Sequence, residues 1–268
     1  MNNTFNINRF GLLLKRQWLD FGKIYLISLV VLAGVLIAAY ALNTNVPKRI
    51  HYTDAQNYFM MTFRIPVFVI VGMLFISIVA STYFAYLGQK PKAILDLMIP
   101  ASIFEKFLAG IFYSAIVGLF SYLLIFYLTD VSYTAYINSQ IDALKASSST
   151  VLEVKGARTF LAEVAPSQKV FNYFIAMPFL LTGVFLLGSI YFDRFHYIKT
   201  AVSVMVFAGI ATYIVAKVAD ILTKNMVMMN HTYYKDKSDE LTIFLIITIL
   251  LTFVIWAIAY IRLKEKEV

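Results

Sequence analysis

The chain has 268 residues, of which 60% are hydrophobic and 14% are charged, and its formal net charge is +8 at pH 7. Soluble domains are about 45–50% apolar with about 25% charged residues, so this composition indicates a membrane protein. The absence of Cys excludes disulfides, thiolate metal sites and Cys nucleophiles. We interpret the positive charge as Lys and Arg beside membrane spans, facing anionic lipid, and not as a nucleic-acid interface.

Residues 8–23 are predicted to form an amphipathic helix at the membrane interface, because large apolar residues recur there with helical spacing. The residues of interest on this helix are Arg9, Lys15, Arg16 and Trp18. Such a helix can lie along the inner leaflet and contact a partner. It can also serve only as a basic lead-in that orients the first span.

Six apolar stretches are predicted to be transmembrane helices, because each has about the 20 residues that a span needs. They cover residues 24–42, 65–87, 107–129, 170–192, 200–222 and 241–261. Pro178 is expected to kink the fourth. Six spans place both termini on one side, and the denser Lys and Arg of the short segments place that side in the cytoplasm. The predicted fold is an all-α integral membrane protein with a single transmembrane domain over residues 1–268.

The longest polar segment, residues 130–169, is predicted to be an extracytoplasmic loop that is too small for a catalytic domain. Residues 137–145 and 157–164 within it could each form a short helix. Residues 193–199 are expected to form a tight inner loop between the fourth and fifth spans.

The segment from Gly88 to Phe107 is predicted to be a structured cytoplasmic loop, since Lys residues lie in it between two apolar runs. Pro91 can begin a short amphipathic helix, and Pro100 ends it. Ser102 and Glu105 have the spacing of a capping box and are expected to open the next helix.

This loop can be a socket for a soluble partner, or a helical hairpin loop that touches only lipid headgroups. For a partner interface, exposed charges would orient docking. The candidate contact residues are Lys90, Lys92, Asp96, Met98, Ser102 and Glu105.

The sequence from Leu97 to Ser102, with Glu105 and Lys106 following, resembles the L-P-x-S-x-x-E-K signature after the second span of bacterial ABC transporter permeases of the type-2 exporter class. Met98 and Ile99 stand where many members carry Leu. The resemblance implies that this loop docks on a separate ATP-binding subunit, and that an N-terminal interfacial helix precedes the first span. It also implies a homo- or heterodimer of permease subunits in the bacterial inner membrane.

The spans contain almost no ionisable groups and no arrangement that predicts a catalytic residue. No phosphate-binding loop is present, so ATP and Mg²⁺ are expected on the partner chain and no cofactor on this one. The three His residues are far apart in sequence and form no zinc pattern. The family resemblance makes an ATP-driven permease the favoured interpretation, a membrane scaffold or sensor that binds a cytoplasmic partner is the second, and a membrane-embedded enzyme is the third.

Overall fold

The computed structural model describes residues 5–43, 63–88, 98–147, 156–164, 168–223 and 237–266, and every regular element in these ranges is helical. Such a fold suits a hydrocarbon environment, because a helix satisfies its backbone hydrogen bonds within one segment. The elements are α1 (Ile7–Asn43), α2 (Arg64–Tyr83), the 3-10 turn η2 (Ala85–Gly88), α4 (Ile103–Ile111), the π-helical turn η3 (Phe112–Val117), α5 (Gly118–Ser147), α6 (Phe160–Val164), α7 (Gln168–Tyr191), α8 (His196–Thr223) and α9 (Lys237–Lys266).

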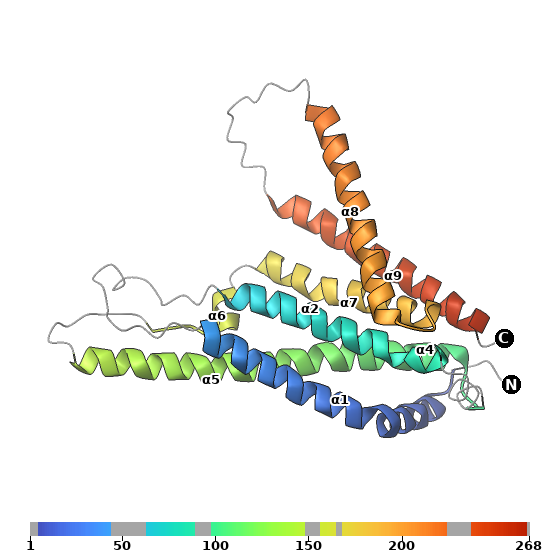
Figure 1. Cartoon of the computed structure of the whole chain (residues 1–268), viewed down its shortest axis with the longest axis horizontal. Helices are drawn as coiled ribbons and strands as arrows, with labels where there is room; N and C mark the ends of the chain where they lie inside the picture. The colour runs from blue at the N-terminus through green and yellow to red at the C-terminus, as the bar shows by residue number, and fades with distance from the viewer. Residues whose placement is uncertain are drawn as a thin grey trace.

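Helices α1, α2, α5 and α7 run side by side along the long axis of the molecule (Figure 1). The most extensive helix contacts are those of α7 with α9 and with α2, and α1 packs mainly on α5. Two apolar clusters hold this bundle together. One joins α2, α4, α7 and α9 around Phe84, Leu186 and Leu263, and the other joins α1, α2 and α5 around Leu36 and Tyr122.

Five of the described helices are long and apolar enough to cross a membrane. They span Ile7–Asn43, Arg64–Leu87, Ile103–Ala146, His196–Val218 and Thr242–Lys266, and a shorter apolar helix covers Ala176–Tyr191. These helices indicate a membrane-embedded protein, in agreement with the composition. Pro178 lies inside α7 as expected, and the Thr182 hydroxyl donates to its carbonyl oxygen at 2.8 Å.

Residues 8–23, predicted as an interfacial helix, and residues 24–42, predicted as the first span, belong to one continuous helix, α1, from Ile7 to Asn43. Its N-terminal part, dark blue in Figure 1, takes a different direction from the remainder. Residues 20–24 contain no Pro, and Asp20 and Gly22, which could cap a helix, lie inside α1 without ending it.

The third predicted span is likewise part of a longer helical run, from Ile103 through the π-helical turn to Ser147. The predicted loop over residues 130–169 therefore begins as helix, and residues 137–145 are the end of α5. Within residues 157–164 only the last five residues are helical, as α6. Polar residues after Thr129 do not end the helix, because its backbone can still bond to itself there.

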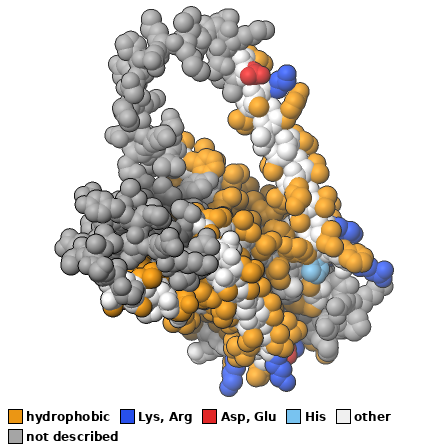
Figure 2. All heavy atoms as spheres, turned by 60° about the vertical axis from the view of Figure 1, so that its left-hand side comes forward, with side chains coloured by type: hydrophobic (Ala, Val, Ile, Leu, Met, Phe, Trp, Pro, Cys, Tyr) orange, Lys and Arg blue, Asp and Glu red, His pale blue; other side chains and the backbone are white. Residues whose placement is uncertain are grey.

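Helix α8 leaves the bundle soon after it begins at His196, and no residue in its apolar window is buried (Figure 1). Hydrophobic side chains follow its length in Figure 2, with charged side chains near both ends. The preceding turn, residues 192–195, is shorter than the predicted loop of residues 193–199 and contains Phe195 with a positive φ of 54°.

We predict that Gly188→Ala separates α7 from α8. A Cβ at Gly188 would lie 2.8 Å from the Cβ of Thr200, at the point where α8 joins the bundle. Overpacking of this kind costs about 1–3 kcal/mol, so the melting temperature in detergent should fall. The matched control is Gly209→Ala, because a Cβ there meets nothing within 4 Å. Equal melting temperatures for the two variants would contradict this prediction.

Candidate functional site

The start of α4 forms the capping box that the sequence predicted. Ser102 is the N-cap in an extended conformation, and its hydroxyl accepts from the Glu105 backbone N–H at 3.2 Å. In return the Ser102 backbone N–H donates to Glu105 Oε2 at 2.9 Å. This reciprocal pair satisfies two amide donors that would otherwise lack partners at the helix start.

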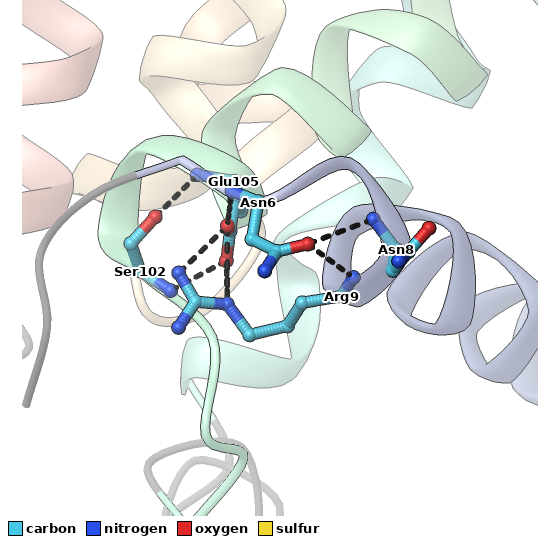
Figure 3. A network of polar contacts seen from close by, with 5 residues as sticks. All are labelled: Asn6, Asn8, Arg9, Ser102 and Glu105. Carbon is cyan, nitrogen blue, oxygen red and sulfur yellow. Dashed lines mark hydrogen bonds and ion pairs between the residues drawn. The ribbon is translucent and has the colours of Figure 1, made fainter.

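The carboxylate of Glu105 also binds the N-terminal segment of the chain (Figure 3). Arg9 donates from Nε to Glu105 Oε2 at 2.8 Å and from a terminal nitrogen to Oε1 at 2.7 Å. The backbone N–H of Asn6 donates to Oε1 at 2.9 Å. A single side chain therefore joins the beginning of α1 to the beginning of α4.

Because Glu105 is buried, its charge needs hydrogen-bond donors from the protein in place of water. Glu105 has no exposed side-chain surface, whereas Arg9 remains 31% exposed. A buried carboxylate is stable as an ion only if charged or polar donors replace its hydration, and Arg9 with two backbone N–H groups does so here. Displacement of α1 from α4 would remove the Arg9 and Asn6 donors and leave the Ser102 N–H to compensate the Glu105 charge, so the two elements are expected to move together.

Further contacts fasten α1 to the same end of the bundle. The Tyr83 hydroxyl of α2 donates to the Gln17 side chain, and the Tyr113 hydroxyl of the π-helical turn donates to the Leu14 carbonyl at 2.7 Å. Trp18 stacks on Tyr113 with ring centroids 6.3 Å apart. The π-helical turn η3 follows α4 directly, and such turns often occur at functional sites.

The other predicted contact residues are placed as follows. Lys90, Lys92 and Asp96 lie outside the described residues, as does most of the expected short helix after Pro91. Met98 is 76% exposed and Trp18 is 40% exposed. Lys15 and Arg16 are exposed on α1 and are available to lipid headgroups or to another protein.

Glu105 was expected to contact another chain, but in the structure its carboxylate is occupied within this chain. A direct contact from Glu105 to a partner stays a prediction, and it would require the Arg9 interaction to open. Sequence reasoning identified both residues separately and did not pair them, because 96 positions separate them.

The C-terminal end of α9 carries a second polar contact. Lys266 donates to Asp193, in the turn between α7 and α8, at 2.6 Å. The hydrogen bond and charge of Lys266 lower the pKa of Asp193 below its usual range. Both residues are partly exposed, so the contact orients the chain end more than it stabilises the fold.

Sequence reasoning missed a buried charge cluster at the opposite end of the bundle. Arg64 and Asp130 are each 1% exposed and form an ion pair at 3.0 Å. In the sequence, Arg64 comes directly before the predicted second span, and Asp130 is the first residue of the predicted loop over residues 130–169. The available signal was that each charge lies at the boundary of an apolar run, where a charge that faces the bundle must find a partner.

No family model, curated protein or solved structure matches the chain in comparisons with known proteins. The described residues contain no group of three or more potential metal ligands among His, Asp and Glu. The Arg9–Glu105 site consists of an ion pair and a helix cap, which together connect the start of α1 to the start of α4.

We predict that Glu105→Ala destabilises the protein more than Ser102→Ala. Loss of the Ser102 cap costs about 1 kcal/mol. Glu105→Ala keeps that bond but removes the carboxylate half of the capping box together with the bonds to Arg9 and Asn6. The free energy of unfolding in mixed micelles measures both. Arg9→Ala should lower the free energy of unfolding in the natural chain but hardly change it in a Glu105→Ala background, because both substitutions break the same interaction. Arg16→Ala is the exposed control, and additive effects of Arg9→Ala and Glu105→Ala would contradict the pairing.

Proposed function

We propose that this chain is the membrane permease subunit of an ATP-driven exporter of the ABC type. In this proposal it carries six transmembrane helices and no ATPase site of its own. A separate subunit binds ATP and Mg²⁺ and docks on the loop from Gly88 to Phe107. The substrate crosses between two permease subunits.

The observation that carries the proposal is the connection that Glu105 makes between the start of α4 and the start of α1. The residues that resemble the permease signature include Ser102 and Glu105, and these two residues form the reciprocal cap of α4. Glu105 also binds Arg9 at the beginning of α1. A force applied to the loop would therefore reach two long helices at once, as a coupling element requires.

The course of the helices supports the same mechanism. α4 continues through η3 into α5, so that Glu105 lies at one end of a helical run that ends at Ser147. Closure of two ATPase subunits would displace the loop, and α1 and α5 would move as a connected pair. Rigid helices that shift between two packed arrangements are a common means of coupling distant sites.

The apolar window of α8, in which no residue is buried by the rest of the described chain, is consistent with a second permease subunit. In this proposal α7 is also a span, the fourth in chain order, although its described apolar part is shorter than those of the other five helices. Both termini would then lie in the cytoplasm of a bacterial cell, at the end of the bundle that holds Glu105, and the second subunit would be identical or related.

We expect an ATP-binding subunit to co-purify with the tagged chain from its native host in mild detergent, as identified by mass spectrometry. The variant Lys92→Glu with Asp96→Lys should reduce its recovery at least tenfold, because charged contacts orient and hold a docked partner. A matched control swaps two charges without changing the net charge at the other end of the bundle, Asp142→Lys with Lys145→Glu. This control should retain the ATPase.

The outcomes separate the possible functions. If no ATP-binding protein is recovered under any extraction condition, the chain is not a permease of this class, and a scaffold or sensor becomes the better account. If both charge swaps lose the ATPase equally, Lys92 and Asp96 are not the docking residues.

A further inference from the structure

Residues 156–164, which we call the strap, lie across the end of the bundle opposite Glu105. Figure 1 places α6, the last part of the strap, beside the end of α1 and the start of α2. The side chain of Asn138 on α5 makes two hydrogen bonds to one strap residue. It accepts from the Ala157 N–H at 2.7 Å and donates to the Ala157 carbonyl at 3.2 Å.

Asp130, about two helical turns before Asn138, binds the strap through one carboxylate oxygen and α1 through the other. Its Oδ2 accepts from the backbone N–H of Phe160 at 2.6 Å, and its Oδ1 accepts from the Tyr40 hydroxyl at 2.9 Å. Asp130 and Asn138 are eight residues apart on one helix and therefore share a face. The chain that they bind runs antiparallel to α5, because Asn138 meets residue 157 and Asp130 meets residue 160.

Arg64 closes the contact from α2. It donates to Asp130 Oδ1 at 3.0 Å, to the carbonyl oxygen of Arg158 at 2.9 Å and to Glu163 Oε2 at 2.9 Å. Arg64 therefore joins the bundle to both the backbone and a side chain of the strap. Glu163 is 32% exposed, so water can reach this last contact.

One aromatic side chain anchors the strap. Phe160 is 6% exposed, and its ring lies 5.0 Å from that of Phe68 and 5.2 Å from that of Phe126. Ala157 is the other buried residue among those strap positions whose side chains are described. The strap thus covers the end of the aromatic cluster with very little buried surface of its own.

Thr134 shows that this polar face offers more hydrogen bonds than the strap uses. It lies between Asp130 and Asn138 at four-residue spacing, and its side chain is 5% exposed. Its hydroxyl has no hydrogen-bond partner among the described residues. A buried hydroxyl in that state normally binds water or a ligand group, so the face formed by Asp130, Thr134 and Asn138 has unused capacity for a polar backbone.

We propose that this face is a binding site for peptide backbone, and that the strap occupies it reversibly. The side chains contact main-chain N–H and C=O groups. The occupant is the chain's own segment, held by Arg64 and by Phe160. The inference is independent of the proposed transport function, because it needs no ATPase.

Reversible opening follows from the small size of the strap. α6 has five residues, well below the roughly 12–15 residues at which isolated helices become marginally stable in water. The strap therefore keeps its conformation only through its contacts with the bundle. Local units with few buried side chains open more often than the whole protein unfolds, and opening would uncover the polar face and the aromatic cluster.

Thiol labelling tests this directly, because the natural chain has no Cys. Ala157→Cys reports strap opening through its rate of reaction with a maleimide. Ser139→Cys, at an exposed position of α5, gives the fully accessible rate, and Ala80→Cys, 0% exposed on α2, gives the rate of the core. We expect Ala157→Cys to react at a rate clearly between these two.

Two second-site changes should accelerate the reaction by different routes. Glu163→Gln removes the charge that pairs with Arg64, and we expect about a threefold increase for this partly exposed contact. Gly156→Ala places a Cβ 2.6 Å from Asn138 Oδ1 and should raise the rate about tenfold. Gly34→Ala is the matched control, since a Cβ there meets nothing within 4 Å.

The result that overturns the proposal is equal labelling of Ala157→Cys and Ala80→Cys in every background. The strap would then open only when the whole protein unfolds and would be a fixed part of the fold. Labelling of Ala157→Cys that ignores both Glu163→Gln and Gly156→Ala would also overturn it, because the contacts described above would not hold the strap.

Discussion

A charge that is removed from water has to be paired inside the protein, and this constraint organises both ends of the bundle. Glu105 at one end and Asp130 at the other are almost completely buried, and each is paired with an Arg from a different helix. Breaking such a pair by removing one partner costs more than the pair contributes when intact. Each pair therefore determines which elements stay together, α1 with α4 at one end and α2 with α5 and the strap at the other.

The two charged ends are connected by one helical run. From Glu105 to Asp130 the chain continues through α4, η3 and α5, a rise of about 37 Å at 1.5 Å per residue. The π-helical turn lies near the Glu105 end, where the Tyr25 hydroxyl lies 3.2 Å from the Val117 carbonyl oxygen. A displacement that begins at the loop before α4 has a continuous path along this helix toward the strap.

The middle of the bundle has a different chemistry. Aromatic rings and aliphatic side chains fill it, and hydroxyl groups such as those of Thr182 and Ser114 bond back to their own helix. Other hydroxyl groups bond across helices, as the Tyr25 hydroxyl of α1 does to Ser121 Oγ of α5 at 2.9 Å. Packing and interhelical hydrogen bonds of this kind are what hold helices together within a membrane.

Local sequence pattern was sufficient for the helical fold class, for the membrane assignment and for the capping box of Ser102 and Glu105. Each of these depends on composition or on residues within one or two helical turns. The lengths of α1 and α5 were misjudged, because hydropathy marks where a chain meets water and not where a helix ends. The pairing of Arg9 with Glu105 and of Arg64 with Asp130 joins residues 96 and 66 positions apart. Such pairs depend on how helices pack, and a single sequence does not encode that packing in any local pattern.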